Sequence, residues 1–478
     1  MPTKQIDESG VYEYTVHPKT GEATIAGVSP VLRGKVAIPE ELDGHPVTGL
    51  GKGSFSTSTV TGVVIPGSVR VVGSTAFYWC TELTEVEFEE GVEEIEDSAF
   101  AVCTKLARVT FPSTLRRIGS LAFHRCTSLT SVQFDKGLES IGDDAFAGCP
   151  LQGTLLLPER LSSLGERVFL DCTGLSQAMV PSGLLHLPSG TFFRCTGLKR
   201  VSLPPSLVSI GSRALAGCSQ LTEIRIPATV TDIGAYAFDG CERLGEFSVE
   251  RGNPSFRSTG GMLFSGDGSR LIRCPAGFKG SCRLPEGVHS VERGAFELCT
   301  RLRRIVFPRS LDSFHEHNLR ECSSLESIEV PEANPNFVVQ NGLLLSHDGK
   351  TLYLCIGDES RDVEIPEGVE RIEPGAFKGH GRLRNVVIPE SVVRIGDEAF
   401  ARCPELREAI LPEGLSILPT RTFYECRKLA TAFLPDRIQT VGKQAFAGCT
   451  SLAKVSLSRT AKIEPWAFDK CPWQPSAS

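Results

Sequence analysis

The 478-residue chain is poor in aromatic residues, which make up 7% of it, and it contains only three tryptophans and three methionines. No uninterrupted apolar run approaches the ~20 residues of a membrane helix, so the sequence predicts a protein that is not integral to a membrane. There is no basic cluster and no interleaving of basic with aromatic residues, and the formal net charge is -7. These features argue against binding to nucleic acid. The opening MPTKQIDESG lacks the apolar segment of a secretory signal, and no anchor pattern follows, so the chain as written is expected in the cytoplasm.

Signatures of catalysis and of cofactor binding are also missing. The sequence has no G-x-S-x-G or H-E-x-x-H motif, Walker loop or dinucleotide fingerprint, and no C-x-x-C pair of the kind that binds zinc. We therefore expect neither an enzyme nor a bound cofactor or metal. The one tight histidine set, His315-Glu316-His317, leaves a metal site open as an alternative, although sequence drift at a turn explains it more simply.

Glycine, proline and cysteine are abundant by contrast, with 47, 30 and 17 residues. The glycines and prolines are not concentrated in a collagen-like or low-complexity segment. An odd number of cysteines in so long a chain is not typical of a disulfide-stapled fold. Because 41% of the residues are hydrophobic and evenly spread, a large core is expected.

A 23-residue repeat runs through most of the sequence. The phrase Ala-Phe-x-x-Cys recurs, and of the 14 intervals between its 15 aromatic-position anchors, 11 are 23 residues, one is 22 and two are 58. Each long interval corresponds to one repeat with an insertion. The anchors are Phe77, Phe100, Phe123, Phe146, Phe169, Phe192, Leu215, Phe238, Phe296, Leu319, Phe377, Phe400, Phe423, Phe446 and Phe468.

Each unit can be followed from its cysteine. After Cys103, the residues Val109 and Phe111 lie two apart, which predicts a short, half-buried strand. Pro112 ends this strand, and Gly119 permits the next bend before the Ala-Phe segment returns the chain. Since one such unit cannot bury its own apolar face, successive units are expected to stack and form continuous internal columns.

This pattern strongly resembles the BspA-like class of leucine-rich repeats, whose units read L-x-x-I-x-I-P-x-x-V-x-x-I-G-x-x-A-F-x-x-C, over about residues 55–471. The resemblance implies a β-rich solenoid, a curved leucine-rich-repeat array of 23-residue units with short parallel strands on the concave face. Residues 1–50 are expected to form an N-terminal β-hairpin cap, and residues 51–478 the solenoid.

The two insertions begin alike, with Asn253-Pro254-Ser255-Phe256 and with Asn334-Pro335-Asn336-Phe337. Each continues through an apolar run, an Asp-Gly pair and a second apolar run, which is typical of a β-hairpin. The sequence therefore predicts inserted hairpins at about 250–285 and 331–366.

Most of the cysteines share one position in the repeat, and His380 takes that position in one further unit. A buried packing role is the simplest interpretation, because unpaired cysteine is among the most buried residue types. The fourteen are Cys80, Cys103, Cys126, Cys149, Cys172, Cys195, Cys218, Cys241, Cys299, Cys322, Cys403, Cys426, Cys449 and Cys471.

Three cysteines lie outside this column. Cys274 and Cys355 are equivalent positions in the two insertions, which favours packing for both. Cys282 has no counterpart, so a Cys274–Cys282 disulfide stays open as an alternative. The sequence does not fix the redox state of these three residues.

An acidic run, EVEFEEGVEEIED, extends from Glu85 to Asp97. A solvated surface strip is the simplest interpretation. Binding of a cation or of a basic partner is the alternative.

The position seven residues after each cysteine position is expected to face solvent, and it is polar in most units. Val387, Ile410 and Phe433 break this rule in three consecutive units, and Leu156 with Met179 in two. A contiguous apolar patch on an open face marks an interaction site. We therefore predict a partner-binding patch on Val387, Ile410 and Phe433, rimmed by Arg384, Arg407 and Glu408, and a secondary patch on Leu156 and Met179.

The resemblance implies a non-enzymatic, protein-binding scaffold that acts as an adhesin or surface-recognition module, because BspA-like proteins are commonly on the bacterial surface or secreted. Its partner would be a protein of unknown identity, for example a host or matrix protein. The abundant cysteines favour the alternative, an intracellular interaction scaffold of the same fold. The sequence leaves the oligomeric state open.

Overall fold

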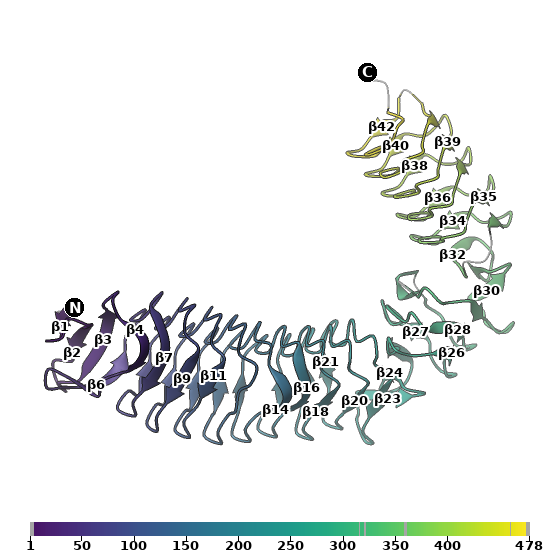
Figure 1. The fold of residues 1–478 in the computed structure, drawn as a ribbon. Coiled ribbons are helices and arrows are strands. Elements are labelled where there is room, and N and C mark those ends of the chain that lie inside the picture. The colour runs from purple at the N-terminus through teal and green to yellow at the C-terminus, as the bar shows by residue number, and fades with distance from the viewer. Residues whose placement is uncertain (1–3, 315, 320–321, 358–360, 459, 475–478) are drawn as a thin grey trace. The chain divides into compact units, whose positions relative to one another are not determined.

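The structure is a computed structural model that describes residues 4–314, 316–319, 322–357, 361–458 and 460–474. Its chain divides into two compact units, Met1–Gly266 with Pro275–Gly277, and Asp267–Cys274 with Phe278–Ser478. Each is an all-β solenoid of parallel strands with a repeat of about 23 residues (Figure 1). One short 3-10 helix, η1 (Glu316–Leu319), is present, and no helix in the described ranges has the length and apolar character needed to cross a membrane. The single solenoid over 51–478 and the concave placement of its strands stay predictions.

The N-terminal strands lead directly into the first coil. β1 (Lys4–Ile6), β2 (Tyr12–Val16) and β3 (Ala23–Val28) pair antiparallel in chain order, and β5 (Glu41–Leu42) forms a short hairpin with β6 (His45–Leu50). β3 pairs parallel with β6, and β4 (Arg33–Ala37) pairs parallel with the first strand of the repeats. The segment thereby supplies the strand partners that a preceding coil would otherwise provide.

In most coils the residues after the buried leucine form the first strand of that coil, whereas residues 130–135, after Leu129, form none. Where neighbouring strands pair, they do so in parallel with a shift of one repeat, so that Val86 lies opposite Val109. The sheet is interrupted between β18 (Arg200–Ser202) and β20 (Glu223–Ile226) and between β35 (Asn385–Val387) and β37 (Glu408–Ile410). In the first unit these first strands are β7 (Thr59–Ile65), β9 (Glu85–Phe88), β11 (Arg108–Thr110), β14 (Gln152–Leu156), β16 (Gly174–Met179), β18 (Arg200–Ser202), β20 (Glu223–Ile226) and β22 (Glu246–Val249). In the second unit they are β26 (Gly280–Arg283), β28 (Leu302–Val306), β29 (Ser327–Glu329), β33 (Asp362–Glu364), β35 (Asn385–Val387), β37 (Glu408–Ile410), β39 (Thr431–Phe433) and β41 (Lys454–Ser456).

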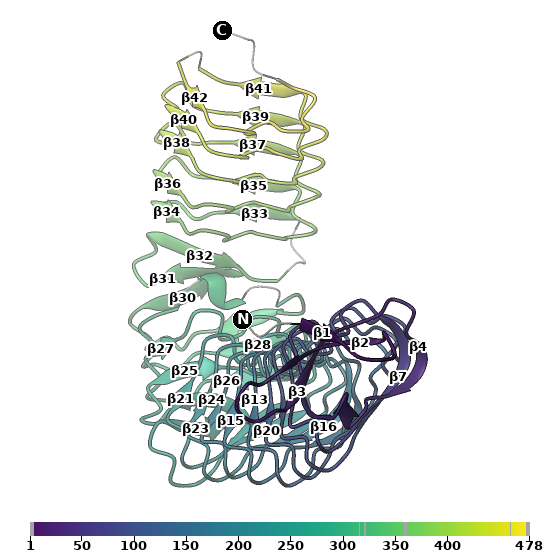
Figure 2. The same cartoon turned by 90° about the vertical axis from the view of Figure 1, so that its left-hand side faces the viewer.

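A second, two-residue strand follows the proline-containing turn of the coils. In the first unit these strands are β8 (Val71–Val72), β10 (Glu94–Ile95), β12 (Arg117–Ile118), β13 (Ser140–Ile141), β15 (Ser163–Leu164), β17 (His186–Leu187), β19 (Ser209–Ile210) and β21 (Asp232–Ile233). In the second unit they are β27 (Ser290–Val291), β34 (Arg371–Ile372), β36 (Arg394–Ile395), β38 (Ile417–Leu418), β40 (Thr440–Val441) and β42 (Lys462–Ile463). Figure 2 shows β33 to β41 and β34 to β42 as two separate ladders of the second unit.

The second ladder is interrupted where proline replaces glycine. Gly442 N donates to Leu418 O at 2.7 Å, and Gly396 N donates to Ile372 O at 2.8 Å. Pro419 occupies the same position one coil earlier than Gly442 but has no N–H to donate. Accordingly β36 and β38 belong to different sheets, as do β15 and β17 at Pro188.

The Ala-Phe segment uses left-handed backbone at residues other than glycine. In the coil of Phe77, Thr75 has φ 57° and Trp79 has φ 61°. The N–H groups of Thr75, Phe77 and Trp79 donate to carbonyls of the next coil at 2.9, 2.7 and 2.9 Å. These hydrogen bonds offset the cost of left-handed backbone, which is about 1–2 kcal/mol for a residue with a side chain.

The core of each unit is built from stacked columns of like side chains. The anchor phenylalanines stack from coil to coil, as for Phe100 and Phe123, whose ring centroids lie 5.2 Å apart with planes at 3°. The column cysteines are buried except for the half-buried Cys322, and no disulfide joins any of the 17 cysteines in the structure. The side chains of Cys274 and Cys282 hydrogen-bond to each other as thiols, and burial raises the pKa of Cys274.

The second insertion contains one strand more than the predicted hairpin. β30 (Phe337–Gln340), β31 (Leu343–Ser346) and β32 (Thr351–Cys355) pair antiparallel in order, and β32 pairs parallel with β34. In the first insertion, β23 (Phe256–Thr259) pairs antiparallel with β24 (Met262–Ser265) in the first unit, whereas β25 (Arg270–Arg273) pairs with β27 in the second. The last strand of each insertion thus takes the place of a second-ladder strand.

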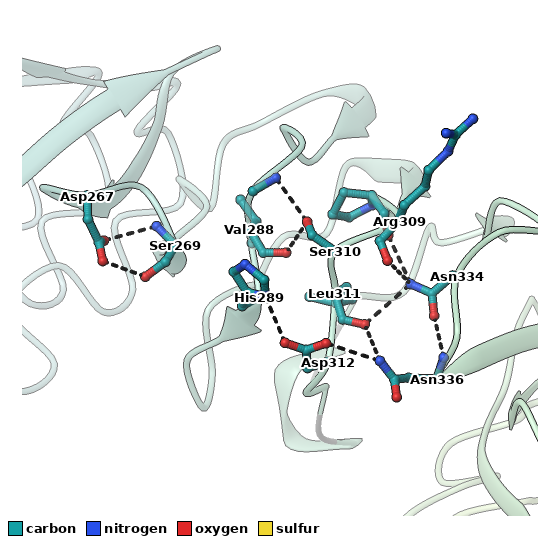
Figure 3. A network of polar contacts seen from close by, with 12 residues as sticks. Asp267, Ser269, Val288, His289, Arg309, Ser310, Leu311, Asp312, Asn334 and Asn336 are labelled. Atoms are coloured by element: carbon teal, nitrogen blue, oxygen red, sulfur yellow. Dashed lines mark hydrogen bonds and ion pairs between the residues drawn. The ribbon is translucent and has the colours of Figure 1, made fainter.

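Asn334 explains why the second insertion begins with Asn-Pro-x-Phe (Figure 3). Its buried Nδ2 donates to Pro308 O at 2.9 Å and to Leu311 O at 3.3 Å, and its Oδ1 accepts from the N–H groups of Asn336 and Phe337. Asn253 makes the equivalent bonds to Pro227 and Val230 in the first insertion. One amide side chain therefore joins the turn of the preceding coil to the start of the inserted sheet.

Candidate interaction surface

The outer face of the first ladder in the second unit carries exposed apolar side chains. On β35 and β37 the side chains alternate, with Val386 and Ala409 buried and Val387 and Ile410 pointing outward. Val387 is 60% exposed and Ile410 is 57% exposed. This agrees with the alternation expected of a half-buried strand.

Phe433 continues the row on the next strand, directly opposite Ile410 in the β37–β39 register. It is half-buried rather than fully exposed, and the Nζ of Lys454 lies 5.3 Å from the centroid of its ring. This cation–π contact covers part of the ring. The apolar row therefore consists of two open aliphatic side chains and one aromatic ring that is partly covered.

Arginines form a second row immediately before strands β33, β35 and β37, and Arg384 and Arg407 are three residues before Val387 and Ile410. Arg384 N donates to Arg361 O at 2.6 Å, and Arg407 N donates to Arg384 O at 3.1 Å, which places the three residues on consecutive coils. Within the described residues none of the three guanidinium groups forms an ion pair or a side-chain hydrogen bond. Arg361 was not among the residues predicted from the sequence. The 23-residue spacing from Arg407 to Arg384, continued one repeat further back, would have found it.

The acidic side chains next to these arginines are held by other partners. Glu408 Oε1 accepts from Thr431 Oγ1 at 3.1 Å, and Asp362 Oδ1 accepts from Asn385 Nδ2 at 2.6 Å. The pKa of Glu405 lies below its ordinary value because Lys428 hydrogen-bonds to its carboxylate, with a smaller contribution from the nearby arginines. Glu408 thus lies on the predicted rim, tied to the neighbouring strand.

The secondary patch lies on the first unit. Leu156 is 61% exposed and Met179 is 50% exposed, and they are opposite each other in the β14–β16 register. The next residue in this row, Ser202, is polar. Val306 occupies the same repeat position, seven residues after the cysteine, and is buried. Residues at this position are therefore not exposed to solvent in every coil.

Basic side chains of neighbouring coils form ion pairs with carboxylates of the acidic run, residues 85–97. Glu85 lies 3.1 Å from Lys35 and 2.6 Å from Arg108, and these hydrogen bonds, that of Arg108 first, lower the pKa of its carboxyl. Glu94 pairs with Arg117 at 3.4 Å. The run therefore behaves as a charged strip with cations beside it, and binding of a separate cation or basic partner stays a prediction.

The predicted alternative at His315-Glu316-His317 lies outside the described residues, since His315 and the side chains of the other two are not among them. Among the side chains that the structure describes, no group of three His, Cys, Asp or Glu is arranged to hold a metal ion.

The extent of the chain that one family model matches identifies the family to which the protein belongs. The family model of the BspA type leucine rich repeat region matches residues 48–176, 139–245, 165–270, 278–339 and 353–473, well over half of the sequence. The chain belongs to the BspA-type leucine-rich repeat family. The resemblance stated from the repeat unit is thereby confirmed.

Solved structures similar to this BspA-type protein come from several bacteria. A leucine rich cell surface protein from Faecalibacterium prausnitzii is 23% identical, with 96% of this chain and 95% of that one covered, at a TM-score of 0.45. A leucine-rich repeat protein from Bacteroides ovatus is 21% identical over 95% and 98% of the two chains, at 0.41. The leucine rich repeat protein of T. pallidum is 29% identical over 45% of this chain and 91% of that one, at 0.36. No curated protein matches the chain.

Proposed function

We propose that this protein is a non-enzymatic, protein-binding repeat scaffold whose partner docks on the apolar row of Val387, Ile410 and Phe433. The observation that carries the proposal is the exposure of Val387 and Ile410 on consecutive strands. The same position is polar on both sides of the row, with Glu364 before it and Ser456 after it.

Burial of these side chains by a partner would be favourable. Full burial of a valine or isoleucine side chain stabilises by about 1.5–3 kcal/mol relative to exposure. The strands beneath are held by inter-coil hydrogen bonds and by buried residues such as Val386 and Ala409, so little conformational entropy is lost on docking. A rigid surface with a solvent-exposed apolar row is suited to protein recognition.

A role in adhesion or surface recognition is what family membership implies, and it is the first form of the proposal. The second form is an intracellular interaction scaffold. Its specific support is the column of buried cysteine thiols, which are most stable in a reducing compartment. Fractionation of cells that express the native gene, followed by detection with an antibody to this chain, separates the two. Signal at the cell surface supports the first, and signal confined to the soluble interior supports the second.

The docking surface itself is tested with the triple variant Val387→Asp, Ile410→Asp and Phe433→Asp. Partners cross-linked to the wild-type chain should be lost from this variant. The matched control carries Asp at Thr110, Gln133 and Ser202, which share the repeat position in the first unit. If the Val387, Ile410 and Phe433 variant retains every partner of the wild type, the proposal fails.

A further inference from the structure

We propose that the docking partner presents an acidic amphipathic α-helix, which lies across strands β33 to β39 with about one helical turn for each coil. This inference rests on the proposed function and adds the chemistry and shape of the partner. It follows from three properties of the surface: the spacing of its coils, the separation of its two rows and the charge of its arginines.

The coil spacing matches a helix better than an extended chain. Neighbouring parallel strands lie about 4.8 Å apart, so like residues recur at that interval along the stack. One turn of an α-helix advances about 5.4 Å, whereas like-facing residues of an extended strand recur about every 6.6–6.8 Å. Over the two steps between Val387 and Phe433, a helix falls out of step by about 1 Å and a strand by about 4 Å. A helix can therefore contact all three coils with equivalent side chains.

The two rows lie at the separation that one helix covers. Arg384 and Val387 are three residues apart on one coil, as are Arg407 and Ile410. Three residues of extended chain span at most about 10 Å, so the two rows lie within about 10 Å of each other along the coil. An α-helix with its side chains is about 10–12 Å wide, so a single helix can rest on the apolar row and reach the arginine row with one flank.

The arginine row selects acidic side chains. Arg361, Arg384 and Arg407 recur on three consecutive coils and have no ion-pair partner among the described residues. Glu405, the acidic side chain whose pKa the charges of Arg384 and Arg407 help to lower, is paired with Lys428. Asp362 and Glu408, each next to an arginine in the chain, are hydrogen-bonded to Asn385 and Thr431. A guanidinium group binds a carboxylate with two parallel hydrogen bonds, which makes stacked arginines suited to a row of Glu or Asp.

These three properties define the partner sequence. Its apolar residues should fall at positions i, i+3 or i+4, and i+7, and its carboxylates should recur with the same spacing on the adjacent flank. The coils of β35 and β37 then each receive one apolar side chain and one carboxylate, whereas the coil of β33 receives a carboxylate at Arg361 and the coil of β39 an apolar side chain at Phe433.

The test uses three synthetic peptides and the full chain. The first peptide is an amphipathic helix with a leucine stripe and a flanking row of Glu. The second has the same leucines with Lys in place of Glu, and the third has the composition of the first with a central proline that breaks the helix. Binding is measured by fluorescence anisotropy and helix content by circular dichroism.

We expect the Glu peptide to bind at least ten times more tightly than either of the others and to gain helix content on binding. The variant Arg361→Ala, Arg384→Ala and Arg407→Ala should remove this preference, whereas Arg371→Ala with Arg394→Ala, on the second ladder, should not. Raising the salt concentration from 0.05 to 0.5 M should weaken binding of the Glu peptide, because exposed charges are screened.

Equal binding of the Glu and Lys peptides, or tighter binding of the proline peptide, overturns the inference. Binding of a sulfated polysaccharide by the wild-type chain, lost in the arginine variant while no peptide binds, also overturns it and assigns the arginines to another class of ligand. Neither result touches the proposed function, which fails only if the triple Asp variant at Val387, Ile410 and Phe433 keeps its native partners.

Discussion

The Sγ of Cys103 lies 3.1 Å from the carbonyl oxygen of Phe77 in the preceding coil and donates its proton to it. Cys126 makes the same contact with Phe100 at 3.2 Å, and Cys403 with Phe377 at 3.1 Å. The repeated cysteine is therefore both a small buried side chain and a donor that ties one coil to the coil before it. This explains why one residue type recurs at this position without forming disulfides.

Replacement of Cys103 by alanine should destabilise the first unit. The change removes a buried sulfur and leaves the Phe77 carbonyl without this donor, at an expected cost of about 1–3 kcal/mol. The lowering of the urea unfolding midpoint, followed by circular dichroism, measures it. Cys355→Ala serves as the control, because Cys355 is half-buried and outside the column. Equal shifts of the urea midpoint for the two variants would show that a cysteine in the column contributes no more to stability than Cys355 does.

The buried thiols should make the protein sensitive to alkali. Burial raises the pKa values of Cys172, Cys195 and Cys218 well above the ordinary thiol value of about 8.5. Below that pH both folded and unfolded thiols hold their protons, and this contribution to stability is complete. As the pH rises past it, the unfolded thiols ionise first, so the free energy of unfolding falls.

The urea midpoint should therefore drop between pH 8 and pH 10, and it should drop less in a variant with alanine at Cys172, Cys195 and Cys218. In the native protein at pH 8, a thiol reagent should modify the half-buried Cys322 and Cys355 first and the column only after denaturation. Rapid native modification of most of the 17 thiols would contradict the burial of the column.

Asn334 should be essential for attaching the second insertion. Alanine at this position removes the amide donor to Pro308 O, one of two side-chain donors to Leu311 O, and the acceptor of two N–H groups, at an expected cost of about 2–4 kcal/mol. Aspartate should be no better, because its carboxylate would face the same two carbonyls. Amide hydrogen exchange in β30 and β31 reports the loss. Asn336→Ala is the comparison variant, because it removes side-chain hydrogen bonds to Leu311 O and Asp312 but leaves those of Asn334 in place. Similar exchange rates for the two variants would refute the role assigned to Asn334.

Gly67 should not accept a side chain. A Cβ built there would lie 1.9 Å from the carbonyl oxygen of Glu90 on the next coil, so the two turns would have to separate. We expect Gly67→Ala to cost about 1–3 kcal/mol. In Gly245→Ala the new Cβ meets only Thr222 O, at 3.7 Å, so thermal unfolding of that variant should match the wild type. A Gly67→Ala protein as stable as the Gly245→Ala protein would show that the turns can move apart without cost.

Several details of the fold and of the candidate surface could be read from single repeats. The alternation around Val387 and Ile410 predicts their outward direction, because a strand exposes every second side chain. The partial burial of Phe433 could not be predicted in this way, since Lys454 comes from the next coil and covers the ring. Arg361 was missed because it follows an insertion, where the cysteine position of the repeat is not visible in the sequence.

By itself, the sequence determined the 23-residue coil, the column of cysteines and phenylalanines, and the family. These follow from short-range patterns, because each coil packs against its immediate neighbours and every neighbour repeats the same residues. Only the tertiary structure decided which backbone groups meet between coils: the left-handed residues such as Trp79, the break in the ladder at Pro419 and the two-sided contacts of Asn334. These depend on hydrogen bonds between residues about one repeat apart, whose geometry no local pattern specifies. The same is true of the candidate surface, where the apolar and arginine rows exist because three coils align in register.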